Sequence, residues 1–153
     1  MAAQLPDVLI LDGSKMSLYS NPLEPYWDLH PKKRPVFQTT KSCKRGYIAT
    51  WEICNDLLIL RTIEGNVERR NYLFWKKMIR FTWKMLFPKV KSGGIVASWF
   101  TGKIRIPEGN ALYYVHNAYD SRFEREIIIT LNKGKVIKKV VLDYKEQKLQ
   151  VQS

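Results

Sequence analysis

The chain has 153 residues, of which 45% are hydrophobic and 26% charged, so it is long enough for one globular domain and its composition is not that of a disordered protein. Its 26 basic and 14 acidic residues leave a formal net charge of +12, which favours anionic partners without selecting among them. No run of about 18 uncharged apolar residues occurs, so the sequence predicts no membrane-spanning helix.

We expect a single domain over residues 1–153, with a frayed C-terminus from about residue 145. The first residues lack the basic segment of a signal peptide, and the two cysteines, Cys43 and Cys54, are too few for a disulfide framework or a zinc site. These features predict a cytoplasmic protein that holds no metal or other cofactor.

Tightly connected strands are predicted over the first half of the chain. Residues 7–18 read as a hairpin around the turn DGS, and the proline-rich residues 21–35 have room for one helical turn near PYWDLH. The stretches 46–53 and 57–63 predict a second hairpin across the turn CND, after which residues 63–70 read as a loop because they are polar and contain Gly-Asn. Alternation along the first strand of this hairpin turns four side chains toward the core: Tyr47, Ala49, Trp51 and Ile53.

The second half contains one expected helix between further strands. Residues 71–87 predict the helix, and residues 95–109 predict two strands that meet near the dipeptide TG. Residues 110–125 suit either one or two helical turns or an irregular loop, whereas residues 126–144 predict a hairpin around the turn NKG. About eight strands and one helix without β-α-β alternation indicate an antiparallel α+β fold, a curled sheet or small sandwich with the helix packed on it.

The expected helix is strongly amphipathic. At about 100° per residue, four cations, Lys76, Lys77, Arg80 and Lys84, gather into one arc, and a wide aromatic and aliphatic face lies opposite. Such a helix suits three uses: covering an antiparallel sheet, lying in the groove of a partner, or binding a membrane surface. The first use leaves the basic arc in water, where an anion can reach it. Residues 71–91 and 133–148 carry net charges of +6 and +4, so most of the charge excess lies in these two stretches.

A second group of candidate residues is polar. His116, Tyr119, Arg122 and Glu124 lie within nine residues of one another, a density that suits an acid/base pair or an anion clamp but equally an ordinary turn. Glu52 and Arg105, on otherwise apolar strands, are expected to pair with each other or to line a polar pocket with this group. We find no catalytic signature, and a Ser-His-Asp arrangement built from this segment has no supporting pattern around the serine.

Two segments carry a resemblance to other proteins. The stretches RGYIATWEI and WFTGKIRIPEG are similar to segments of a group of short, uncharacterised bacterial proteins, and the similarity extends over much of residues 8–143. The resemblance implies a compact domain and carries no activity or site residues.

The leading functional hypothesis is a small non-catalytic binding domain that engages an acidic protein surface, as an inhibitor, an immunity-like protein or an accessory subunit. Concentrated charge and abundant aromatic residues are common at such interfaces. One alternative is nucleic-acid binding through the basic arc, and another is a small-ligand enzyme that uses residues 116–124. Association with a membrane surface is a further alternative for the amphipathic segment.

Overall fold

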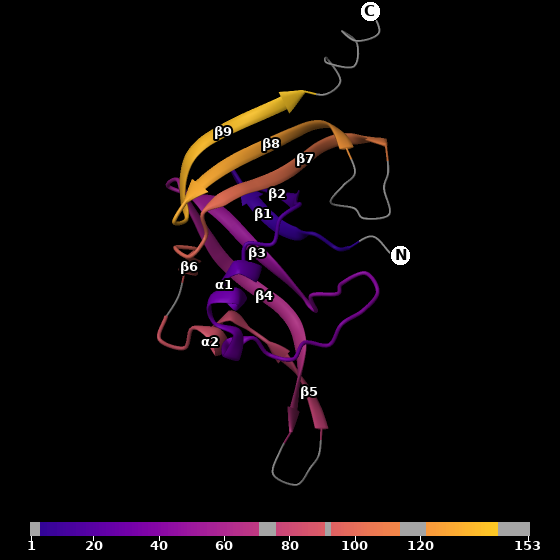
Figure 1. Ribbon diagram of the computed structural model, residues 1–153, viewed down its shortest axis with the longest axis vertical. Coiled ribbons are helices and arrows are strands. Elements are labelled where there is room, and N and C mark those ends of the chain that lie inside the picture. Colours follow the sequence, from indigo (N-terminus) through magenta and orange to yellow (C-terminus); the bar gives the residue numbers. More distant parts are fainter. Residues whose placement is uncertain (1–3, 71–75, 91–92, 114–121, 144–153) are drawn as a thin grey trace, which may run out of the picture.

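The computed structural model describes residues 4–70, 76–90, 93–113 and 122–143, without the side chains of residues 69–70, 76–77, 109–113 and 122–123. Nine strands form one mixed sheet in this part of the chain (Figure 1). The strands are β1 (Asp7–Leu11), β2 (Ser14–Leu18), β3 (Tyr47–Cys54), β4 (Leu57–Arg70), β5 (Lys76–Phe81), β6 (Ile95–Val96), β7 (Gly102–Tyr113), β8 (Arg122–Asn132) and β9 (Lys135–Asp143). The described helical segments are α1 (Glu24–Leu29), a 3₁₀ turn (Pro31–Lys33) and α2 (Trp83–Leu86).

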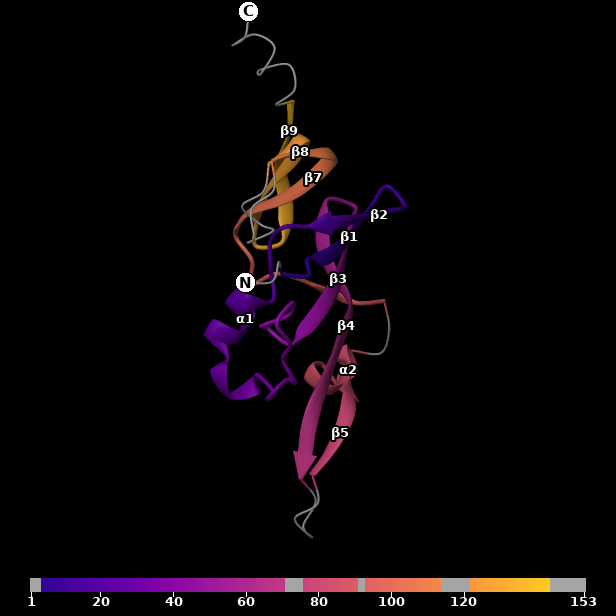
Figure 2. The same ribbon diagram turned by 90° about the vertical axis from the view of Figure 1, so that its right-hand side faces the viewer.

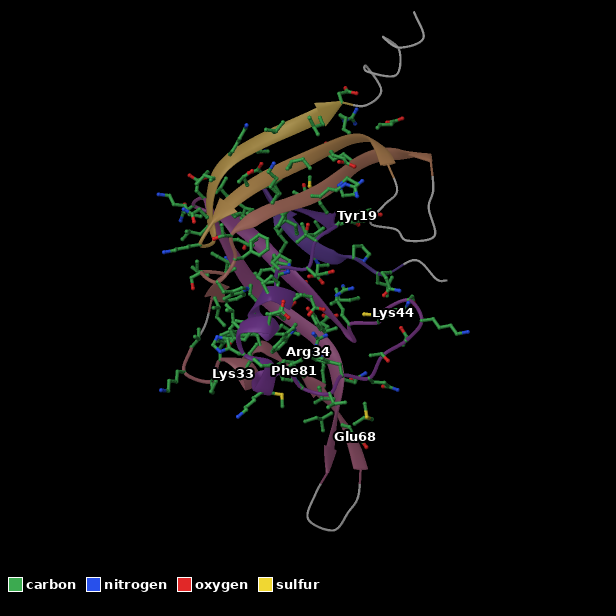
Figure 3. All side chains as sticks on the ribbon, viewed as in Figure 1. Tyr19, Lys33, Arg34, Lys44, Glu68 and Phe81 are labelled. Atoms are coloured by element: carbon green, nitrogen blue, oxygen red, sulfur yellow. The ribbon has the colours of Figure 1, made fainter. Side chains whose placement is uncertain are left out.

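The strand order β2-β1-β3-β4-β9-β8-β7 is antiparallel except where β1 runs parallel to β3. The sheet curls, because the chain just after β2 reaches β7: the Tyr19 amide donates to the Arg105 carbonyl at 2.8 Å, and the Arg105 amide donates to the Ser20 hydroxyl at 3.2 Å. Figure 3 shows Tyr19 at this junction, where the Arg105 guanidinium also lies 5.5 Å from the centre of its ring. The predicted antiparallel, strand-rich character of the fold is therefore confirmed.

The central strand β4 organises the sheet. One edge of β4 pairs with β3. The other edge pairs over short stretches with three strands: β9 at Leu57, β6 at Ile59 and Leu60, and β5 from Gly65 onward. The loop predicted over residues 63–70 is wrong, because these residues continue β4 and pair with β5. The Gly65-Asn66 pair lies inside β4 rather than in a turn. Glycine suits position 65 for its lack of a side chain, because an added Cβ would lie 3.0 Å from the Phe37 ring and 2.8 Å from the Gly46 carbonyl oxygen.

The α+β class, with a main amphipathic helix over residues 71–87 packed on the sheet, is also wrong, because the structure is mostly strand and forms one mixed sheet. Residues 71–75 lie outside the described part of the chain, residues 76–81 form β5, and only Trp83–Leu86 are helical. No described helix reaches seven residues. The Phe, Trp, Ile and Thr residues of this segment favour strands. The second half of β4 also has backbone N–H and C=O groups that need partners, and a strand pairs with them whereas a helix cannot. Phe81 is buried at 5% exposure as a member of the core.

The three turns predicted from DGS, CND and NKG are confirmed by the β1-β2, β3-β4 and β8-β9 hairpins. The expected helical turn is α1, and Figure 2 shows it on one side of the ribbon formed by β3, β4 and β5. Trp27 of α1 is 2% exposed and joins a core that includes the predicted inward-facing Tyr47, Ala49 and Trp51. Aromatic rings thus take the place beside the sheet that the longer helix was expected to fill.

Candidate functional site

The short helix α2 lies between two open hollows that are bordered by basic side chains. Its neighbour Phe87 anchors it, because the Phe87 ring centre lies 5.4 Å from that of Tyr26 in α1 and 6.3 Å from that of Trp99. Trp83 and Leu86 pack partly buried against the core. The outer face of α2 therefore carries Lys84 and Met85, and Met85 is 42% exposed.

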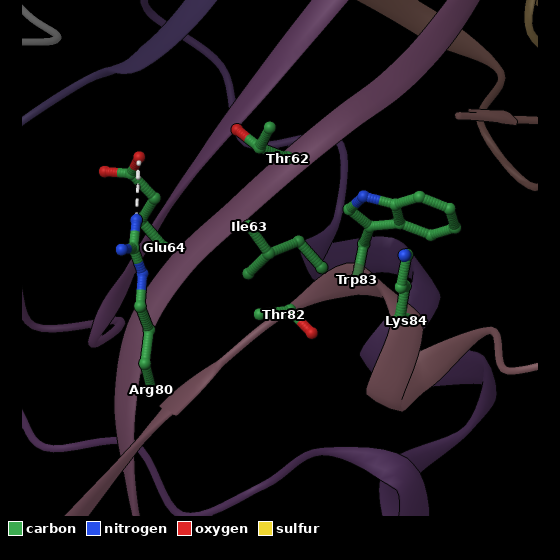
Figure 4. A pocket seen from close by; sticks show the side chains of 7 residues that line it. All are labelled: Thr62, Ile63, Glu64, Arg80, Thr82, Trp83 and Lys84. Carbon is green, nitrogen blue, oxygen red and sulfur yellow. Dashed lines mark hydrogen bonds and ion pairs between the residues drawn. The ribbon is translucent and has the colours of Figure 1, made fainter. Parts of the chain in front are cut away.

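The first hollow, of about 360 Å³, separates β4 from the junction of β5 and α2 (Figure 4). Its lining residues combine an apolar floor with hydroxyl and charged groups: Thr62, Ile63, Glu64, Arg80, Thr82, Trp83 and Lys84. The Arg80 guanidinium forms a long ion pair with the Glu64 carboxylate, at 3.5 Å, and the two side chains are 72% and 62% exposed. An ion pair this long and this exposed contributes little, so Arg80 can turn to another anion at small cost.

The second hollow, of about 350 Å³, lies beyond the C-terminal end of α2. It is lined by Lys33, Leu86, Phe87, Pro88, Lys89 and Val90. Lys33 comes from the 3₁₀ turn that follows α1, so it reaches this place from a segment distant in sequence (Figure 3). Two ammonium groups beside an apolar wall suit a ligand group that is anionic at one end and apolar at the other.

We use the name α2 surface for these two hollows and the cations that border them: Lys33, Arg80, Lys84 and Lys89. Four positive charges, from the 3₁₀ turn, β5, α2 and the turn after α2, border these hollows, and Glu64 is the one acidic residue among the described residues that line them. Each cation is exposed, so each contributes a weak, salt-screened attraction and the set contributes a local positive potential.

The structure places two of the four cations predicted to form one arc at a common hollow. Arg80 and Lys84 border the same hollow, whereas Lys76 and Lys77 open β5 and their side chains lie outside the described part. Because a strand alternates its residues between two faces, the helical spacing that grouped the four no longer applies. Lys33 and Lys89 were missed, since no local pattern shows that the 3₁₀ turn after α1 approaches the end of α2.

The predicted polar group is only partly described. His116 and Tyr119 lie outside the described residues, Arg122 opens β8 with its side chain also outside them, and Glu124 is a partly exposed residue of β8. Glu52 and Arg105, expected to pair or to share a pocket, are engaged separately. Glu52 accepts from Arg61 Nε at 2.8 Å, and Arg105 forms an ion pair with the buried Glu126.

Sequence reasoning also missed a buried charge cluster at the start of β1. Asp7 is fully buried, and its carboxylate accepts from Arg45 Nη2 at 2.8 Å, the Ala49 amide at 3.0 Å and Trp51 Nε1 at 3.2 Å. Burial raises the pKa of the Asp7 carboxyl, while the Arg45 charge and the three donors oppose that rise. The cluster ties β1 to β3 and has no opening to a ligand, so we interpret it as structural.

Three further results concern metal ions, membranes and known proteins. Among the described residues, no group of three or more His, Cys, Asp and Glu side chains is arranged to hold a metal ion. None of the described helices is long and apolar enough to cross a membrane. Comparisons with protein-family models, curated proteins and solved structures return no match for this chain.

Proposed function

We propose that this protein is a small, non-catalytic binding domain that engages an acidic protein surface, as an inhibitor, an immunity-like protein or an accessory subunit. The observation that supports the proposal is the α2 surface, where Lys33, Arg80, Lys84 and Lys89 border two hollows against one weakly held acid, Glu64. A cytoplasmic setting is part of the proposal, and the free thiols of Cys43 and Cys54 agree with it.

The lining of the hollows favours an acidic protein over a nucleic acid. Ile63 and Trp83 form part of the first hollow, and Leu86, Phe87 and Val90 form part of the second. Apolar pockets beside cations suit protein segments in which leucine-like side chains alternate with carboxylates. Phosphate backbones require cations alone, and base recognition relies on arginine or amide side chains at base edges or on aromatic rings on which bases stack. Trp83 and Phe87, the aromatic residues of the hollows, are partly buried against the core.

A binding experiment separates these partners. A fluorescent peptide with glutamates and leucines is compared with single-stranded and double-stranded oligonucleotides of equal net charge, by anisotropy at increasing salt. We expect the peptide to bind at least about tenfold more tightly near physiological salt, because only the peptide fills the apolar hollows. Tighter binding of an oligonucleotide, with a steep loss as salt rises, would instead support the nucleic-acid alternative.

Matched charge variants locate the interface. The double variant Arg80→Glu/Lys84→Glu should weaken peptide binding by about tenfold, because two attractive charges at the first hollow become repulsive. The control Lys15→Glu/Lys41→Glu makes the same change in net charge at exposed positions of β2 and of the loop before β3, and should alter binding less than about twofold. Equal losses in both variants would show that net charge, rather than the α2 surface, attracts the peptide.

A further inference from the structure

Within the part of the chain that the structure describes, no strand pairs with the outer edge of β9 along most of its length. At its start, Lys135 pairs with Leu57 of β4, and the Val136 amide donates to the Asp56 carbonyl at 2.8 Å. Because β4 and β9 run in opposite directions from this point, they part at once. Beyond Val136, the described pairing of β9 is with β8 alone, and Figure 1 shows β9 as the outermost strand of its arm of the sheet.

The composition of this edge combines lysines with exposed apolar side chains. Ile137 and Val141 are 61% and 56% exposed, and the neighbouring Lys138 and Lys139 are exposed as well. A β-bulge leaves Ile137 without an opposite residue in β8, and regular pairing of β9 with β8 resumes at Lys138. From Lys138 on, the outer edge of β9 therefore has regular strand geometry. Lysines on an edge strand discourage association with other strands, but two large apolar side chains left in water do the opposite.

We propose that the outer edge of β9, from Lys138 to Leu142, binds an extended acidic segment of a partner protein by adding it to the sheet as a further strand. The backbone N–H and C=O groups of an open edge supply a ladder for such a segment, and the side chains select it. A second copy of the chain is a poor occupant, because β9 contains three lysines and one aspartate and two such strands repel each other.

The two adjacent lysines define the chemistry of the segment. Lys138 and Lys139 are consecutive, so they lie on opposite faces of the strand and call for acidic residues on both faces of the partner. Ile137 and Val141 lie on either side of the lysines and favour apolar neighbours in the partner. The matching segment therefore has two adjacent carboxylates flanked by β-branched residues. This inference does not rest on the α2 surface, which belongs to other elements.

The test uses the full chain and a capped peptide of about eight residues, with two adjacent glutamates flanked by valines and threonines. Two isomers of the peptide are N-methylated on alternate residues, in opposite phase. In an added strand, one alternate set of amides donates to β9 and the other points away. We therefore expect one isomer to lose at least about tenfold in affinity by anisotropy and the other to bind like the parent peptide. Hydrogen exchange should slow at the amides of residues 138–142.

Charge variants and mass measurement complete the test. Lys138→Glu/Lys139→Glu should weaken parent binding about tenfold, and Lys138→Gln/Lys139→Gln should weaken it less, while Lys15→Glu/Lys41→Glu serves as the control of equal charge change. Circular dichroism checks that each variant is folded. The proposal is overturned if the parent peptide does not bind, if both methylated isomers bind equally, or if light scattering shows that β9 instead joins two copies of the chain.

Discussion

The charge cluster at Asp7 gives the sharpest test of the fold. Asp7→Asn preserves the shape of the side chain but removes the charge opposite Arg45, whose own side chain is only 7% exposed. The Asp7 carboxyl group accepts hydrogen bonds from three donors, one of which is a guanidinium. Such a set of donors favours the ionised carboxylate. Removing one partner of a buried ion pair leaves the other charge uncompensated, which typically costs about 3–5 kcal/mol.

We place the expected loss for Asp7→Asn near the lower end, at about 3 kcal/mol, because Arg45 keeps its hydrogen bond from Nη1 to the Leu5 carbonyl at 2.7 Å. Urea denaturation followed by far-ultraviolet circular dichroism measures this loss. With a denaturant slope of about 1.5 kcal/mol per molar, the midpoint should fall by about 2 M. The matched control is Glu24→Gln, whose ion pair with Arg34 is 34% and 37% exposed and should be worth less than about 1 kcal/mol.

A double-mutant cycle with Arg45→Met tests the cause of the loss. If the cost arises from the uncompensated charge of Arg45, the double variant should lose clearly less than the sum of the two single variants. Additive losses, or a loss for Asp7→Asn no larger than that for Glu24→Gln, would refute the argument that the pair is buried and coupled.

Two further predictions concern the core. Gly134→Ala should destabilise the fold by at least about 2 kcal/mol more than Gly13→Ala. Both glycines have φ of +81°, but of the two only Gly134 lies against backbone, where an added Cβ would be 2.7 Å from the Ala97 carbonyl oxygen. Equal losses of stability in urea denaturation would contradict this reasoning. Burial, and after it the charges of Glu24 and Asp7, raise the pKa of Tyr47 well above its usual range. Because an acid whose folded pKa is raised keeps its proton while the unfolded chain releases one, stability should fall above about pH 10, by up to about 1.4 kcal/mol per pH unit. Tyr47→Phe removes this contribution, so a wild type that loses no more stability than Tyr47→Phe between pH 9 and 11 would count against the burial of the hydroxyl.

Local signals were sufficient wherever a feature depends on neighbouring residues. The turns DGS, CND and NKG place residues at positive φ, namely Asp12 and Gly13, Asn55 and Asp56, and Lys133 and Gly134. These turns, and the alternation that buries Tyr47 and Trp51, follow from steric preferences within a few residues. The same local reasoning failed over residues 76–81, because a segment rich in aromatic and apolar residues satisfies helical and strand periodicities alike.

The sequence by itself determined the charge excess, the antiparallel strand pairing, the hairpin turns and the short α1, since each follows from composition or from contacts between near neighbours. The α+β class that it predicted was wrong. Only the tertiary structure decided that residues 76–81 form a strand, because the choice depends on whether β4 offers an unpaired edge. Tertiary structure likewise brought Lys33 to the end of α2 and paired Asp7 with Arg45 across 38 positions of the chain. Such pairings join residues far apart in sequence, and their energy depends on burial that the whole fold creates.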